Sequence, residues 1–214
     1  REAALAAGYP WKADLNAPTG EGVSCNPINS RNGHRVTTND GYLEPARGRR
    51  NLEIRGGALV DRVLFEGRRA VGIRVRFGTE PWTQIHGREI VLCAGAVHSP
   101  TILMRSGIGP AAQLQALGIP VLQAHAAVGG NLMDHPILRA TMDLRPEHRA
   151  LGPDARHTNC CVTYSSGLAG GGERDMILVA YNHRGLTGPE PTPQGAVGAG
   201  LYDAFSRGSL HLTS

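Results

Sequence analysis

The chain has 214 residues, of which 41% are hydrophobic and 19% are charged, a balance typical of a folded globular protein rather than a disordered one. Its length suits one large domain or parts of two, and no apolar run approaches the roughly 20 residues of a membrane-spanning helix. The net charge of +4 comes from arginine, since Lys12 is the only lysine. Because the arginine clusters lack interleaved aromatic residues, we interpret them as solvated surface and expect no nucleic-acid binding.

The first part of the chain predicts loops followed by a small meander of strands. Residues 1 to about 35 are rich in Gly, Pro and Asn without a sustained period, and Thr37 to Ala46 is expected to be helical. Three strands, rich in Val, Ile and Leu, are then expected at residues 51–55, 58–65 and 70–77. The tight turn around Gly67 predicts that the last two form an antiparallel hairpin.

The next segment predicts a strand, a turn and a helix. The apolar run from Gln84 to Cys93 is expected to be a strand whose second half, from Glu89, is buried, and it leads into the small-residue turn Ala94-Gly95-Ala96. A helix is expected from Pro100 to Ser106, with Ser99 as its N-cap and Gly107 as the left-handed residue after its last turn. Such units bring backbone close to phosphate-bearing cofactors in α/β proteins, although many of these turns bind nothing.

The remaining sequence predicts a second short helix and then antiparallel sheet. The helix is expected at residues 110–117 and ends at Gly118. Beyond Pro136, the segments without helical periodicity favour antiparallel strands over further β-α-β units. These strands are expected at residues 137–144, 157–165, 176–182 and 209–213. The stretch from Gly185 to Gly200 is rich in Gly and Pro, so it is expected to be irregular and mobile.

The four cysteines predict neither a disulfide framework nor a metal site. Cys93 lies in an apolar run and is expected to be buried. Cys160 and Cys161 are adjacent, and sequence neighbours rarely bridge because their side chains diverge on an extended backbone. His157 precedes this pair, but a closed zinc site needs four ligands and the sequence offers no second pair. We therefore expect reduced thiols, as in a cytoplasmic protein, and no bound metal.

Several blocks along the chain occur in the order seen in one enzyme family. Gly95-Ala96-x-x-Ser99-Pro100, followed by Ser106-Gly107-Ile108-Gly109, resembles a motif of the glucose–methanol–choline (GMC) oxidoreductases, which are FAD-dependent enzymes that oxidise alcohols. Further blocks that resemble this family are Gly41–Ala46, Asn51–Arg55, Leu117–Val121, Val128–His135 and Ser206–Ser209. The resemblance spans nearly the whole chain.

The resemblance implies a mixed α/β and α+β fold in three parts. Residues 51–135 would form part of an FAD-binding domain of GMC type, and residues 136–214 part of a substrate-binding domain on an antiparallel sheet. The first 50 residues would bridge the two or belong with the substrate domain. In GMC enzymes a valine after the Asn51-Leu52 block meets the adenine through its main chain, which makes Val60 the expected contact.

Ala94, Gly95 and Ala96 form a second candidate set for cofactor binding, because only small residues let a chain pass close to a dinucleotide. No catalytic residue is assigned. Asp134 and His135 are neighbours in sequence that seldom point at each other, so they are expected to be structural or to mark a domain junction. His98 is expected to lie at the surface or behind a site.

Two absences predict an internal fragment of a longer enzyme. No Gly-x-Gly-x-x-Gly follows an apolar strand near the start of the chain, and the family's catalytic histidine would lie beyond the last block. The resemblance implies a choline dehydrogenase-like parent in which an alcohol passes a hydride to FAD while a histidine removes the hydroxyl proton. The fragment alone is expected to be inactive. A non-catalytic α/β binding or assembly module stays open as the alternative.

Overall fold

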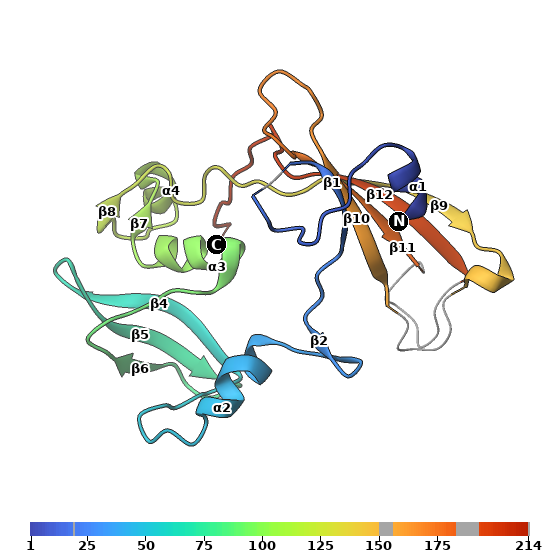
Figure 1. Ribbon diagram of the computed structural model, residues 1–214. Coiled ribbons are helices and arrows are strands. Elements are labelled where there is room, and N and C mark those ends of the chain that lie inside the picture. Colours follow the sequence, from blue (N-terminus) through green and yellow to red (C-terminus); the bar gives the residue numbers. More distant parts are fainter. Residues whose placement is uncertain (19, 150–155, 183–192, 214) are drawn as a thin grey trace. The chain divides into compact units, whose positions relative to one another are not determined.

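The computed structural model describes residues 1–18, 20–149, 156–182 and 193–213, and the chain divides into two compact units (Figure 1). Unit 1 consists of Arg1–Ala46 and Asp134–Phe205, and unit 2 of Arg47–Met133 and Ser206–Ser214. One boundary therefore falls between Met133 and Asp134. Within the described residues, no helix has the length and apolar character needed to cross a membrane.

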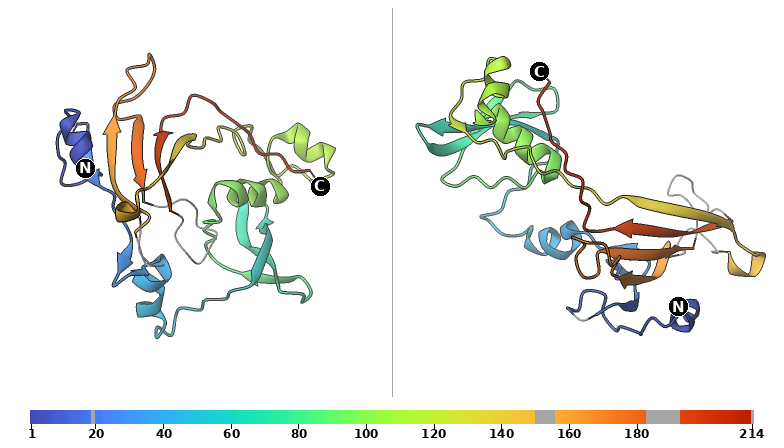
Figure 2. Two further views of the ribbon diagram at one scale, coloured as in Figure 1. Left: turned by 90° about the vertical axis from the view of Figure 1, so that its right-hand side faces the viewer. Right: turned by 90° about the horizontal axis from the view of Figure 1, so that it is seen from above.

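Unit 2 joins a three-stranded antiparallel sheet to a helix that packs on its first strand (Figure 2). The sheet contains β4 (Ala58–Glu66), β5 (Arg69–Phe77) and β6 (Thr83–His86), and the helix is α3 (Gly95–Arg105). Beyond α3 follow β7 (Ile108–Gly109), α4 (Ala111–Ala116) and β8 (Gln123–Ala124), with β7 and β8 parallel.

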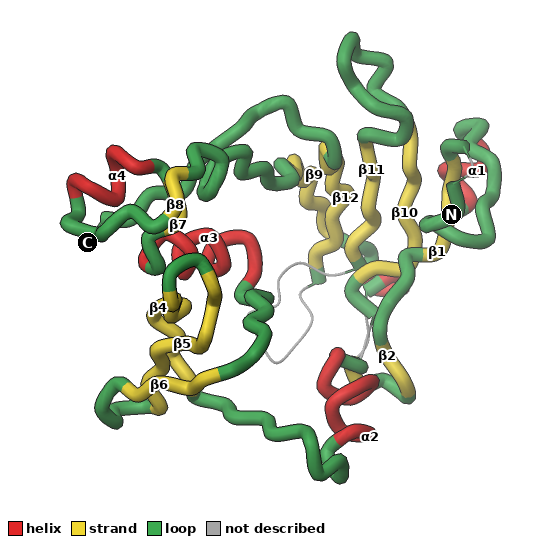
Figure 3. The backbone as a smooth tube through the Cα atoms, turned by 90° about the vertical axis from the view of Figure 1, so that its left-hand side faces the viewer, coloured by secondary structure: helices red, strands yellow, loops and turns green. Residues whose placement is uncertain are grey.

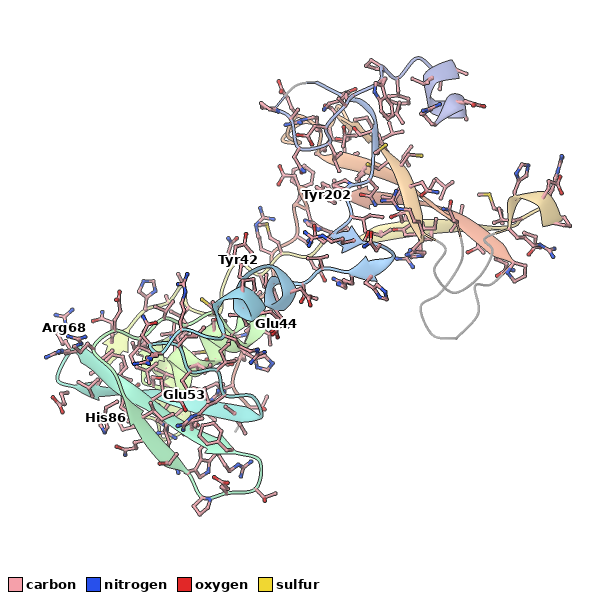
Figure 4. The ribbon with its side chains drawn as sticks, turned by 60° about the horizontal axis from the view of Figure 1, so that its bottom comes forward. Tyr42, Glu44, Glu53, Arg68, His86 and Tyr202 are labelled. Atoms are coloured by element: carbon pink, nitrogen blue, oxygen red, sulfur yellow. The ribbon has the colours of Figure 1, made fainter. Side chains whose placement is uncertain are left out.

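The hairpin prediction is confirmed. Glu66 pairs with Arg69 across a turn in which Gly67 has a φ of +57°, and the exposed Arg68 lies at its tip (Figure 4). The second helix is confirmed as well, because α4 buries Leu114 completely and is followed by Gly118 with a φ of +68°.

Two strand predictions in unit 2 are wrong. Residues 51–55 form no strand, and the strand expected from Gln84 to Cys93 ends at His86. Beyond it, Val91 is 74% exposed and Cys93 is also exposed. No described strand pairs with residues 89–93. An apolar run indicates a tendency to be buried, but a strand also requires a neighbour to take its backbone hydrogen bonds.

The helix in this region begins earlier than predicted. It starts at Gly95, so Gly95 and Ala96 belong to α3 and not to the expected turn, Pro100 lies inside α3, and Ser99 is not its N-cap. Instead, Ser99 Oγ accepts a hydrogen bond from the backbone N–H of Ala94 at 3.0 Å. The end of the helix is as predicted, because Gly107 has a φ of +87°, and a Cβ there would lie 2.5 Å from the Pro120 carbonyl oxygen.

Unit 1 is built on a five-stranded antiparallel sheet with the order β1-β10-β11-β12-β9 (Figure 3). Its strands are β1 (Gly22–Cys25), β9 (Ile137–Asp143), β10 (Thr158–Tyr164), β11 (Met176–Tyr181) and β12 (Gln194–Leu201). The short elements are α1 (Glu2–Ala6), β2 (Ser30–Arg31), β3 (His34–Arg35), the π-helix η1 (Asn39–Leu43), α2 (Glu44–Ala46) and the 3-10 helix η2 (Pro146–His148). The predicted antiparallel sheet is thus confirmed, and the helix expected from Thr37 to Ala46 is found as η1 followed by α2.

Strand β12 corrects the prediction of an irregular loop at residues 185–200. Residues 185–192 lie outside the described part, but residues 194–200 belong to β12, which pairs with strands on both sides. A Cβ at Gly198 would lie 2.9 Å from Tyr181 Cε2, and one at Gly200 would lie 3.1 Å from Ile177 Cγ2. These glycines permit close packing, whereas in the sequence they indicated a mobile loop. The strand expected at residues 209–213 does not form.

Asp175 ties together the connection between β10 and β11. Its Oδ1 accepts a hydrogen bond from the Ser166 backbone N–H at 2.7 Å, and its Oδ2 accepts one from the Ser166 hydroxyl at 2.6 Å. The residue is only 3% exposed. The hydroxyl bond, followed by the amide bond, lowers the pKa of Asp175 from its ordinary value of 3.8. The folded state therefore favours the charged carboxylate.

We expect Asp175→Asn to destabilise the protein in a pH-dependent way. A carboxylate whose pKa is lowered by folding stabilises the folded state above its unfolded pKa of about 3.9, and this contribution is lost as the pH falls through the folded pKa. At pH 7 the melting temperature should fall by about 2–4 °C. The difference in melting temperature between wild type and variant should disappear below about pH 4.

The control is Asp203→Asn, which changes an exposed carboxylate in the same unit. Thermal unfolding followed by circular dichroism between pH 3 and pH 7 measures both effects. A difference between wild type and Asp175→Asn that stays constant with pH would show that shape, rather than charge, explains the role of Asp175.

Candidate functional site

A cavity of about 630 Å³ lies in unit 2, between the sheet, the extended segment 89–94 and α3. This volume is in the range of small-molecule sites, about 300–1,000 Å³. Most of the lining is apolar and includes Ile73 and Ile85 from the sheet and Ile102 from the helix. The polar side chains at its wall include those of His86, His98 and Arg105, and Figure 4 shows His86 on β6.

The start of α3 borders this cavity at Ala94. Gly95 has a φ of +82°, a left-handed conformation that favours glycine, and the Ala94–Ser99 hydrogen bond closes the turn. No side chain of the described residues caps the first helical turn. Its backbone N–H groups are therefore available to a ligand, and the helix dipole makes this end partially positive.

Strand β4 also lines the cavity, through Ala58, Leu59 and Val60, and its backbone is held by the side chain of Arg105. Its Nε donates to the Asp61 carbonyl oxygen at 2.7 Å, and its Nη2 lies 3.5 Å from the Val60 carbonyl oxygen. The same Nε lies 3.5 Å from Asp61 Oδ1. The ladder between β4 and β5 shifts register between Val60 and Arg62. Arg105 thus supports the strand where its regular pairing is interrupted.

Ser106 makes the second connection between α3 and β4. Its Oγ accepts a hydrogen bond from the Val63 backbone N–H at 2.9 Å and donates one to the Ile102 carbonyl oxygen at 2.6 Å. Through Arg105 and Ser106, the end of α3 therefore bonds to the backbone of β4 on both sides of the register shift. The sequence identified Ser106 only as part of a motif and did not identify Arg105, because nothing local indicates a partner more than forty residues away.

The structure brings some of the expected site residues together. Val60 and Ala94 line the same cavity, and Gly95 and Ala96 follow directly at the start of α3. Whether these four residues contact a cofactor stays a prediction. His98, which was expected at the surface or behind a site, is exposed and lines the cavity.

Asp134 and His135 show no arrangement for proton transfer between their side chains. Asp134 Oδ1 accepts a hydrogen bond from the backbone N–H of His135 at 2.8 Å. The His135 ring lies against the ring of Tyr202, with 4.8 Å between the centroids. Tyr202 belongs to unit 1, as Figure 4 shows.

We expect Arg105→Met to destabilise unit 2 by about 1–3 kcal/mol, because it removes charge-assisted hydrogen bonds to β4 while keeping the apolar stem. The control Arg68→Met removes an exposed arginine at the hairpin tip and should change stability by no more than about 0.5 kcal/mol. Urea unfolding measures both variants. If both variants lost the same free energy of unfolding, the hydrogen bonds from Arg105 would not stabilise the strand.

Comparisons with known proteins agree with the order of the sequence blocks. A family model described as GMC oxidoreductase matches residues 1–137. An oxygen-dependent choline dehydrogenase from Pectobacterium carotovorum is 48% identical over 137 residues, which cover 63% of this chain and 24% of that protein. An uncharacterised GMC-type oxidoreductase from Rhodococcus erythropolis is 36% identical over 212 residues, covering 99% of this chain and 41% of that protein.

A solved structure shows the same relationship. The crystal structure of pyridoxine 4-oxidase from Mesorbium loti is 28% identical, with a TM-score of 0.80. The match covers 99% of this chain and 42% of that one, so the chain spans less than half the length of each of these relatives. Together with the family model, these matches show that the chain belongs to the GMC oxidoreductase family, whose members are FAD-binding flavoproteins.

Proposed function

We propose that this chain is part of an FAD-dependent oxidoreductase that oxidises alcohols, and that its unit 2 contributes to the FAD site. The observation that carries the proposal is the cavity in unit 2, whose lining includes Val60 of β4 and Ala94 at the start of α3. The alternative, a non-catalytic binding module, is not favoured, because the family blocks and the family model both match extensively.

The wall at Val60 suits the adenine of FAD. The edge of an adenine presents a donor next to an acceptor, and the N–H and C=O of one residue form the complementary pair. The Val60 carbonyl already lies near Arg105, but a carbonyl oxygen has two lone pairs and can accept a second bond. Ile73 and Ile102 supply apolar surface for a flat ring.

The start of α3 suits a part of the cofactor that carries negative charge. Its uncapped first turn offers backbone donors and the positive end of the helix dipole. Ala94 and Ala96 are exposed and small, so they leave room for a ligand to approach the backbone. In this proposal Val60 orients the adenine end through its backbone, and Ala94, Gly95 and Ala96 line the approach to the helix.

Bound FAD would supply the hydride acceptor for alcohol oxidation. The residues of this chain would bind and orient the cofactor, and none is assigned a catalytic role. The names of the relatives suggest choline and pyridoxine as the first two alcohols to test. Unit 1, with its antiparallel sheet, would contribute to the substrate-binding part.

We expect the isolated 214-residue chain to fold but to retain little FAD and to oxidise neither choline nor pyridoxine. It lacks the Gly-x-Gly-x-x-Gly turn that grips a pyrophosphate, and each 1.4 kcal/mol of lost binding energy weakens affinity about tenfold. Flavin fluorescence titration and alcohol-dependent dye reduction measure the two properties. If this chain alone bound one FAD per molecule and oxidised an alcohol, the proposal that the pyrophosphate is bound by residues outside this chain would be wrong.

In the longest open reading frame that contains this sequence, we expect Gly95→Ala to weaken FAD binding about tenfold or more. The control is Gly118→Ala. Both glycines have positive φ, +82° and +68°, and at neither would a Cβ meet a described atom within 4 Å. Both substitutions should therefore cost a similar backbone strain of about 1–2 kcal/mol.

Only Gly95 lies beside the proposed cofactor, so only its variant should lose flavin affinity beyond the shared strain. Thermal unfolding of the apoprotein checks that the two variants are equally stable, and titration with FAD measures binding. Equal FAD affinity in the two variants would remove Gly95 from the site.

A further inference from the structure

Two cysteines face each other across the outermost strand pair of unit 1. Cys25 on β1 is the register partner of Cys160 on β10, and Figure 3 shows the two strands adjacent at one edge of the sheet. The next pair, Asn26 and Asn159, is joined by a backbone hydrogen bond of 3.0 Å. Because the two kinds of pair alternate in an antiparallel ladder, Cys25 and Cys160 form a non-hydrogen-bonded pair.

This pair has the geometry that a disulfide needs. Side chains of a directly opposed pair lie on one face of the sheet, and they are closest at non-hydrogen-bonded positions. The Cα atoms in such a pair are about 4.5 Å apart, which lies within the range of about 4.4–6.8 Å found in disulfides. Cys161, the next residue on β10, is buried, and the ladder from β10 to β11 shifts register between Thr158 and Cys161, whereas the ladder from β1 to β10 is regular.

The three thiols of this region differ in accessibility. Cys25 is exposed, Cys160 is half-buried and Cys161 is buried. Burial, followed by the charges of Cys160 and Cys25, raises the pKa of the Cys161 thiol to about 11. Since the thiolate is the reactive form, Cys161 is a poor competitor at neutral pH. Because the charges of Cys25 and Cys160 both raise the pKa of Cys161, the three thiols are near neighbours.

We propose that Cys25 and Cys160 form a reversible disulfide when the protein meets a peroxide. The Cys25 thiolate attacks one oxygen of hydrogen peroxide, which breaks the O–O bond and yields a sulfenic acid and water after proton transfer. The Cys160 thiolate then attacks the Cys25 sulfur, the S–S bond forms and a second water leaves. The two thiols lose two electrons and two protons, and one peroxide is reduced to two waters. A dithiol reverses the reaction by exchange.

The bond would fasten an edge strand. β1 lies at one end of the strand order and has only four residues, Gly22 to Cys25. In sequence, the whole of residues 47–133 lies between the two cysteines, so the disulfide would close a long loop and restrict the unfolded chain strongly. Oxidation would therefore stabilise unit 1, and reduction would return β1 to its hydrogen bonds alone.

The test uses the full chain treated with an equimolar amount of hydrogen peroxide, alkylated and digested without reductant. We expect one intramolecular cross-linked peptide joining Cys25 to Cys160, and the loss of two of the four titratable thiols. The melting temperature should rise by about 5 °C or more, and dithiothreitol should reverse the rise. Peptide mapping of the wild type needs no variant and stays informative if a variant misfolds.

Cys25→Ser and Cys160→Ser should each abolish both the cross-link and the thermal shift. The matched control is Cys93→Ser, which removes an exposed thiol from unit 2 and should leave both unchanged. Three outcomes would overturn the proposal: no Cys25–Cys160 peptide, a bridge that uses Cys161, or disulfides only between copies of the chain.

Discussion

Unit 2 depends on the attachment of α3 to β4. The last turn of the helix holds the strand through Arg105 and Ser106, while Ile102 is 4% exposed where the helix faces the cavity. Met104 is completely buried, and a Cβ at Gly109 would lie 2.9 Å from its Cγ, so the chain after the helix packs directly on this side chain. One helix therefore fixes both the irregular strand beside the cavity and the segment that follows. A change in its last turn would disturb both together.

Unit 1 depends instead on pairing between distant parts of the sequence. Val23 on β1 is completely buried, and its backbone N–H and C=O bond to Pro10 and Lys12. On its other side β1 pairs with β10, which lies beyond residue 157. The first residues are thus held by a sheet that the chain completes only after passing through unit 2. This topology joins residues 1–46 and 134–205 in one unit and leaves residues 47–133, together with residues 206–214, in the other.

The features that neighbouring residues determine were predicted correctly from the sequence. The hairpin around Gly67 and the end of α3 at Gly107 both follow from turn chemistry and were found as expected. Where the deciding partner is distant in sequence, local patterns failed. The glycines of β12 indicated a loop because their packing against Tyr181 and Ile177 is invisible in sequence. Ser99 was expected to be the N-cap because its type suits that position, whereas it lies inside α3 and its hydroxyl accepts a hydrogen bond from the N–H of Ala94, the residue before the helix. At the candidate site, Val60 came from the family resemblance and the small residues came from the strand-turn-helix pattern, while the supporting Arg105 required the structure.

Two glycines of the same motif are explained in different ways, and the difference bears on function. At Gly107, a Cβ would meet the Pro120 carbonyl oxygen at 2.5 Å, so packing within the chain explains the residue. Gly95 has a positive φ but open space around its missing side chain, so its conformation alone explains the glycine. Neither reason extends to Ala94 and Ala96, which are exposed. In the proposed site their small size would let a cofactor pass close to the backbone at the start of α3, as in dinucleotide sites.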